Sequence, residues 1–184
     1  MNASTAIVPT PVTFQRAGVK ETTVLLVLAW AVPFAVHLVP WSGERTLGAY
    51  LLPMMWTTLV AVYFFGAWTG LVTALCAPAI NLLVTGLPAW PRVGFASFEL
   101  VVFVAVMAFA IRRWPCAVWL APIGYIIAKL CTAGLQVMLG DAGVSPASLQ
   151  NSFTRAVAGM LVLTTIHVAL GRFFPKSERG KSLP

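Results

Sequence analysis

The chain has 184 residues, enough for one domain. It is 59% hydrophobic and 9% charged, whereas a soluble domain of this size carries about a quarter charged residues. The composition therefore excludes an ordinary soluble domain and indicates a membrane protein with several spans. The net charge of +7 comes from short basic clusters between apolar blocks, so it indicates membrane topology rather than nucleic-acid binding.

Six apolar segments approach the length of about 20 residues that a helix needs to cross a bilayer. In chain order they are Glu21–Pro40, Leu47–Phe65, Gly66–Thr85, Gly94–Arg112, Ala117–Leu139 and Ser152–Phe173. The second and third run together, and we divide them at Phe65 and Gly66 because their combined length is too great for one span; five spans is the alternative. The sequence thus predicts an all-α membrane protein, a six-transmembrane-helix bundle over residues 20–174 between tails at 1–19 and 175–184.

The basic residues predict the orientation of this bundle. With six spans both termini lie on one side of the membrane, and eight lysines and arginines fall on that side against two in the opposite loops. The eight are Arg16, Lys20, Arg112, Arg113, Arg172, Lys176, Arg179 and Lys181, and the two are Arg45 and Arg92. By the positive-inside rule both termini are expected to be cytoplasmic. The N-terminal tail lacks the apolar core and cleavage site of a signal peptide.

Six polar side chains lie within or at the ends of these spans, where polar groups are costly. They are His37, Asn81, Glu99, Lys129, Gln136 and Arg155. Lys129 is the most costly, since it lies about ten residues, or about 15 Å, from the outer end of its span. Glu99 is the one carboxylate well inside a span, and we expect the two to pair directly or through a ligand.

The depths of the six residues favour a binding site. The predicted span directions put all of them in the outer half of the membrane, with Lys129 at the floor, while the inner half has His167. Lys129, Thr132 and Gln136 also share one helical face. We therefore predict a polar pocket that opens outward and binds a neutral or negatively charged ligand with an apolar or aromatic body.

Each of these residues also has a purely structural interpretation. Arg155 is about one turn inside and can extend its charged end to the interface. His37 and Gln136 can satisfy loop backbone, and Asn81 can form a hydrogen bond between helices. Glu99 and Lys129 can be a structural ion pair. The sequence shows no paired acids, no cysteine or histidine spacing typical of a metal site, and no serine–histidine pair at matching depth, so neither an enzyme nor a cofactor is expected.

Two further patterns concern the helices themselves. Ala31 and Ala35 form a small-x-x-x-small pair that allows close helix approach, on the side of the first span away from His37. In the third span, Gly86 is expected to end the helix, and Pro78 is expected to break it locally and leave a carbonyl free.

The region from Leu47 to Val102 carries a series of motifs. They are Gly66-Ala67-Trp68-Thr69-Gly70, Ala77-Pro78-Ala79, Asn81-Leu82-Leu83, Thr85-Gly86-Leu87-Pro88 and Phe98-Glu99-Leu100. This order resembles the substrate-binding S components of energy-coupling factor (ECF) transporters, the membrane subunits of vitamin importers. The signatures of the biotin, riboflavin, thiamine and folate members are not found, and the first outer loop, Trp41 to Thr46, is short for a substrate lid.

The resemblance implies a mechanism. An S component binds a vitamin-like micronutrient in an outward-facing pocket of a six-helix fold in the bacterial or archaeal plasma (inner) membrane. It associates through small residues of its first helix, here Ala31 and Ala35, with a coupling membrane subunit and two cytoplasmic ATPase subunits. The chain has no phosphate-binding loop, so ATP hydrolysis is expected in those partners. The alternatives are a structural or scaffold membrane subunit and a solitary small-molecule transporter, although the chain shows no internal repeat.

Overall fold

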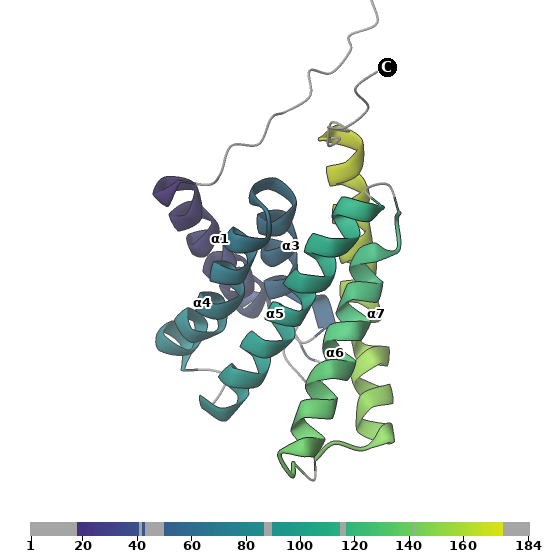
Figure 1. Ribbon diagram of the computed structural model, residues 1–184. Coiled ribbons are helices and arrows are strands. Elements are labelled where there is room, and N and C mark those ends of the chain that lie inside the picture. Colours follow the sequence, from purple (N-terminus) through teal and green to yellow (C-terminus); the bar gives the residue numbers. More distant parts are fainter. Residues whose placement is uncertain are drawn as a thin grey trace, which may run out of the picture.

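The described part of the chain folds into six helices of a single antiparallel bundle (Figure 1). The computed structural model describes residues 18–40, 42, 50–86, 90–114, 117–141 and 143–174. The helices are α1 (Val19–Leu38), α3 (Pro53–Phe65), α4 (Ala67–Thr85), α5 (Trp90–Arg113), α6 (Leu120–Met138) and α7 (Pro146–Phe173). No strand occurs within these ranges.

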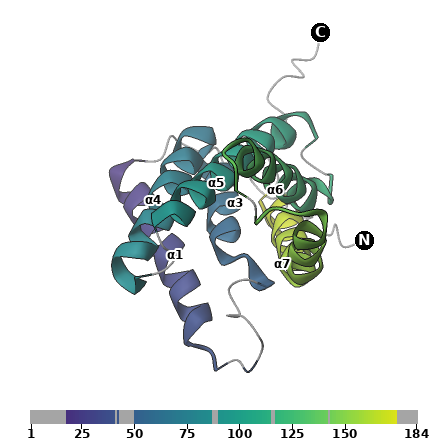
Figure 2. The ribbon, with the colours of Figure 1, turned by 90° about the horizontal axis from the view of Figure 1, so that it is seen from below.

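The helices alternate in direction, so the start of α1 and the end of α7 lie at the same end of the bundle (Figure 1). Seen along the bundle in Figure 2, α3 lies in the middle. It contacts α1, α4, α5 and α7, while α6 packs against α5 and α7. Six helices of alternating direction bring both ends of the described chain to one end of the bundle. The number of membrane spans and the side on which the ends lie stay predictions.

Four of the helices are long and apolar enough to cross a membrane: α1, α5, α6 and α7. The other two, α3 and the Ala67–Leu83 part of α4, are apolar but shorter. At 1.5 Å per residue the 13 residues of α3 span about 20 Å, less than the hydrocarbon core of about 30 Å. The chain is therefore a helical protein with the character of a multi-pass membrane protein.

The predicted division between the second and third apolar segments is confirmed. Helix α3 ends at Phe65 and α4 begins at Ala67, with Gly66 between them at φ 86°. That backbone conformation strongly favours glycine, which carries no Cβ. The amide of Gly66 donates to the carbonyl of Val62 and closes the last turn of α3.

The predicted start of the second segment at Leu47 lies outside the described residues. Tyr50 and Leu51 are helical, Leu52 interrupts the helix, and α3 begins at Pro53. Proline has no amide proton to donate and disfavours a helical conformation in the residue before it. Leu52 accordingly has φ 54°, in the left-handed region. The Tyr50–Leu52 segment crosses α7 at Gly159, where a Cβ atom would lie 2.7 Å from the Tyr50 carbonyl oxygen.

The expected break at Pro78 is also wrong, since α4 continues through it to Thr85. Proline removes one helical hydrogen bond, but the residue is buried against its neighbours and the flanking turns hold the helix. The expected end of the helix is confirmed. Gly86 adopts φ 71° and its amide donates to the carbonyl of Leu82.

The other helix starts differ from the predicted ones. Helix α5 begins at Trp90, ahead of the predicted Gly94, and α7 begins at Pro146, ahead of the predicted Ser152. The start of α7 is fixed by a capping box, in which the Ser145 side chain accepts from the Ser148 amide and the Ser148 side chain accepts from the Ser145 amide. These turns are polar, so apolar content alone did not reveal them.

The core lies between α3 and the helices around it. Its largest fully buried side chains include Tyr63, Phe103 and Tyr125. Two glycines allow close approach: a Cβ at Gly70 of α4 would collide with Val62 of α3, and Gly124 of α6 lies against Phe103. Of the Gly66-x-x-x-Gly70 pattern, Gly70 serves packing within the bundle, whereas no atom lies within 4 Å of the Cβ position of Gly66.

Candidate functional site

Glu99 of α5 and Lys129 of α6 form an ion pair between their helices. Lys129 Nζ donates to Glu99 Oε2 at 3.1 Å. Glu99 is 13% exposed and Lys129 is 29% exposed, so neither charge is fully removed from the surface of the molecule. The predicted direct contact is confirmed. A pair at this depth stabilises both charges, because each would be costly alone in an apolar surrounding.

Lys129 points toward the bundle rather than toward lipid. It lies on one face of α6 with Tyr125 and Thr132, which are 2% and 3% exposed. The opposite face carries the exposed residues Ile127 and Cys131. Ile126 and Leu130, at the edge of the Lys129 face, are exposed too. Gln136 lies two turns beyond Lys129 on the inner face and is half-buried. The polar face predicted from spacing is thus directed inward, and Gln136 lies between the ion pair and the end of α6.

Two aromatic residues missed by the sequence reasoning belong to this region. Tyr125 lies one turn before Lys129 on α6 and is buried in the core. Its ring meets Phe153 of α7 edge-to-face, with centroids 6.4 Å apart. The i−4 spacing of Tyr125 from Lys129 was the signal that could have identified it.

The remaining predicted site residues belong to other helices: His37 to α1, Asn81 to α4 and Arg155 to α7. Asn81 is 6% exposed on the face of α4 that also carries Gly70, and it has an interaction of its own. Arg155 is half-buried and also has a partner. At 100° per residue it lies about 200° around α7 from Phe153, so it faces away from Tyr125. The side chain of His37 lies outside the described residues.

The charges of Glu99 and Lys129 balance each other within the pair. The part that Arg155 plays in the charge of the site stays a prediction. The two charged groups, with Gln136, can hydrogen-bond a polar ligand, and the half-buried Phe153 can stack on its apolar body.

The inner half of the bundle contains a buried histidine, as the sequence indicated. His167 of α7 is 2% exposed, and neither ring nitrogen has a hydrogen-bond partner that satisfies the geometric criteria within the described residues. Its ring lies edge-to-face with Tyr63 at 6.5 Å. Tyr63 itself donates toward the carbonyls of Leu170 and Phe174, which ties α3 to the end of α7.

The small residues of α1 lie on a side that the bundle leaves largely open. Ala31 is half-buried and Ala35 is exposed, whereas Leu25, Ala29 and Pro33 form the buried face. The other helices cover little of α1, since 17% of its residues from Val19 to Val36 are buried. Its outer side is therefore available for contact with lipid or with another helix.

No protein-family model, curated protein or solved structure matches the chain.

Proposed function

We propose that the six helices form six membrane spans and that the chain is the substrate-binding subunit of an ECF-type importer, which captures a vitamin-like micronutrient from outside the cell. Four helices meet the length and composition of membrane spans. With the shorter α3 and α4 the number of spans is six. An even number places both termini, with their basic residues, on the same side of the membrane. The motif order between Leu47 and Val102 supports the same assignment.

The observation that carries the proposal is the ion pair of Glu99 and Lys129. Two partly exposed charges between membrane helices are expensive to keep for packing alone, since apolar residues of similar size fill such a position at lower cost. A polar ligand that hydrogen-bonds both groups offsets that cost. Phe153, which is half-buried and packs against the buried Tyr125, provides aromatic surface on the neighbouring helix. The cargo we propose is therefore polar at one end, with an apolar or aromatic body.

The segment before α3 lies at a defined depth along α7. Tyr50 and Leu51 are helical, and the helix is interrupted at Leu52, whose φ is 54°. Gly159 is 13 residues beyond the start of α7 at Pro146, about 20 Å along that helix. The Tyr50–Leu52 segment that crosses it would therefore lie inside the membrane, on the side of the bundle where the proposal places the cargo.

The partners follow from the same assignment. A binding subunit of this kind needs a coupling membrane subunit and two ATPase subunits to move its cargo. The open side of α1, with Ala31 and Ala35, is the surface we assign to the coupling subunit. The site residues proposed for the cargo remain Glu99, Lys129 and Gln136, with Asn81, Arg155 and His37 as further candidates for the wall and mouth of the pocket.

Purification of the full chain from its own cells in mild detergent tests this function. The proposal expects a coupling membrane protein and two ATPase subunits to co-purify, and it expects Lys129→Met to leave that assembly unchanged. Loss of the partners in Lys129→Met, but not in the lipid-facing control Leu130→Met, would instead identify a scaffold subunit. Cargo uptake by cells that lack any such ATPase would identify a solitary transporter.

A further inference from the structure

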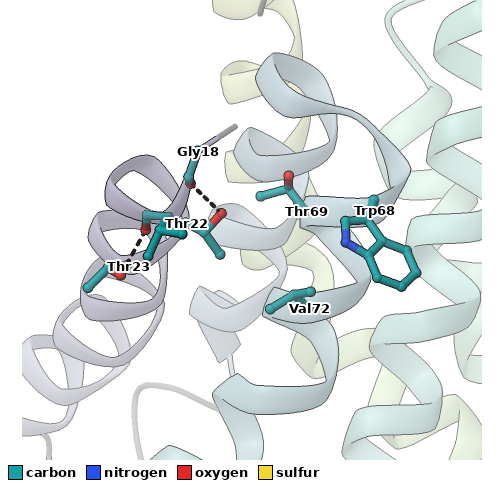
Figure 3. Close-up of a pocket in the computed structure, with 7 residues that line it drawn as sticks. Gly18, Thr22, Thr23, Trp68, Thr69 and Val72 are labelled. Carbon is teal, nitrogen blue, oxygen red and sulfur yellow. Dashed lines mark hydrogen bonds between the residues drawn. The ribbon is translucent and has the colours of Figure 1, made fainter. Parts of the chain in front are cut away.

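A groove opens between the start of α1 and the start of α4, far from the ion pair (Figure 3). Its volume is about 240 Å³. Thr22 and Thr23 of α1 form one wall and Trp68, Thr69 and Val72 of α4 form the other. The groove lies at the end of the bundle that carries the basic residues, which the positive-inside rule places at the cytoplasmic surface.

Thr69 is the unusual residue of this groove. The other buried threonines each donate to a carbonyl of their own helix; these are Thr57, Thr58, Thr73 and Thr132. Thr69 is 5% exposed, and its hydroxyl makes no hydrogen bond within the described residues. It lies in the first turn of α4, where the carbonyl four residues earlier belongs to α3. The hydroxyl oxygen is not among the fully enclosed polar atoms without a partner, so it opens onto the groove, where it can donate to a ligand acceptor.

The first turn of α4 adds further donors on the same wall. Its amides at Ala67, Trp68 and Thr69 have no acceptor within their helix, and no side chain caps this end. No acidic residue lies in that turn. The start of α1 differs, because Glu21 Oε2 lies 2.7 Å from the position of a Cβ on Gly18. The positive end of α4 therefore favours an anionic group on the Thr69 side.

The α1 wall has the opposite character. The Thr22 hydroxyl donates to the Gly18 carbonyl at 3.0 Å, and the Thr23 hydroxyl donates to the Val19 carbonyl at 2.8 Å. These bonds use the two hydroxyl protons and leave the oxygens as acceptors. Figure 3 shows Thr22 and Thr69 on facing walls. The groove therefore fits a ligand with an anionic group and, beside it, a hydrogen-bond donor.

The surroundings identify the kind of molecule that carries these groups. Trp68 is 78% exposed, as expected for an indole at the lipid–water interface. Below the threonines the wall becomes apolar at Val72, and Leu75 of α4 is exposed one turn further. Lys20 is exposed beside the groove. We propose that the groove binds a glycerophospholipid, with its phosphate at Thr69 and the start of α4 and its headgroup donor at Thr22 and Thr23.

Lipid retention measured by native mass spectrometry tests the proposal. The purified full chain is equilibrated with phosphatidylglycerol, phosphatidylethanolamine or phosphatidylcholine of the same acyl chains, and bound lipid is counted during stepwise delipidation. Choline has no hydrogen-bond donor, so phosphatidylcholine is expected to be retained least. Thr69→Val is expected to lower retention of phosphatidylglycerol about three- to tenfold, and Thr69→Ser to restore it. Thr165→Val of α7 removes an exposed hydroxyl away from the groove and serves as the control.

Several results would overturn the proposal. If the protein retained the three lipids equally, the proposal would be wrong. It would also be wrong if the Thr69→Val and Thr165→Val variants retained equal amounts of phosphatidylglycerol. Displacement of the bound lipid by millimolar glycerol phosphate would show a soluble phosphate site instead. If Thr69→Val does not fold, Thr69→Ala and Trp68→Leu replace it, and unchanged retention in both would count against the proposal. If a co-purified membrane protein, rather than lipid, covers Trp68, the groove is the binding site of a partner helix and the lipid proposal is wrong.

Discussion

The backbone of Tyr50 lies against Gly159 of α7, so closely that the Tyr50 carbonyl oxygen is 2.7 Å from the position of an added Cβ. The adjoining carbonyl carbon of Leu51 lies 2.9 Å from the same position. Backbone cannot move aside as a flexible side chain does, so this contact requires glycine. The segment before α3 and the middle of α7 are thereby fixed to each other.

Gly159→Ala is expected to displace the Tyr50–Leu52 segment and to destabilise the protein by about 1–3 kcal/mol, because overpacking strains both backbones. Thermal unfolding in detergent measures the effect. Gly134→Ala in α6 is the matched control: no atom lies within 4 Å of its Cβ position, so alanine there is expected to be neutral or to stabilise by about 0.5–1 kcal/mol. Equal melting temperatures of the two variants would contradict the described contact.

The ion pair predicts a specific pattern in a double-mutant cycle. Glu99→Gln or Lys129→Met alone leaves one charge without its partner and is expected to cost about 1–3 kcal/mol, below the cost for a fully buried pair because Lys129 is 29% exposed. The double variant is expected to be more stable than either single variant. The free energy of unfolding, measured by denaturant titration, gives this coupling. The control is a second cycle in which Glu21→Gln takes the place of Glu99→Gln, and no coupling to Lys129→Met is expected there. Additive effects of Glu99→Gln and Lys129→Met would mean that the two side chains do not interact.

The Tyr63 hydroxyl predicts a smaller effect at the other end of the bundle. It lies 2.8 Å from the Phe174 carbonyl, which follows the last turn of α7, and 3.2 Å from the Leu170 carbonyl, which also accepts from the Phe174 amide. Tyr63→Phe is expected to cost about 0.5–1.5 kcal/mol and to increase hydrogen exchange at the end of α7. Exchange in α5 serves as the internal control. An unchanged rate of hydrogen exchange at the end of α7 would mean that the Tyr63 hydroxyl does not stabilise this end of the helix.

The six-span orientation predicts which loops react from outside. In a chain with Cys76, Cys116 and Cys131 replaced by alanine, Asp141→Cys is expected to react with a membrane-impermeant maleimide in intact cells. Trp114→Cys is expected to react only after permeabilisation, because it follows the two arginines of α5. The reverse pattern would mean that the orientation of the bundle in the membrane is opposite to the predicted one. Labelling of both positions from outside would contradict the proposal that α6, which lies between them, crosses the membrane.

The sequence was sufficient for the helices and for the ion pair. Apolar runs located every helix, and Gly66 marked the division between α3 and α4, because both signals are local. The ion pair followed from the cost of isolated charges in lipid, which leaves Lys129 few alternatives to Glu99.

The remaining features depend on contacts that no local pattern specifies. Tyr50–Leu52 is as apolar as the helix that follows it, so the interruption at Leu52 was missed. Tyr125 and Phe153 resemble lipid-facing aromatic residues until α6 and α7 are packed together. The missing partner of Thr69 depends on where α4 begins. Arg155 was grouped with Lys129 by depth, which does not specify the face of α7 on which it lies.

The central claim is that the bundle binds a small molecule at Glu99 and Lys129, and native mass spectrometry of the intact, detergent-purified chain tests it most directly. The account predicts one small-molecule adduct on the wild-type protein, retained in Leu130→Met and lost in Lys129→Met. Extraction of that adduct identifies the cargo. A folded wild-type protein without any adduct after growth in rich medium, or an adduct that persists in Lys129→Met, would contradict the claim.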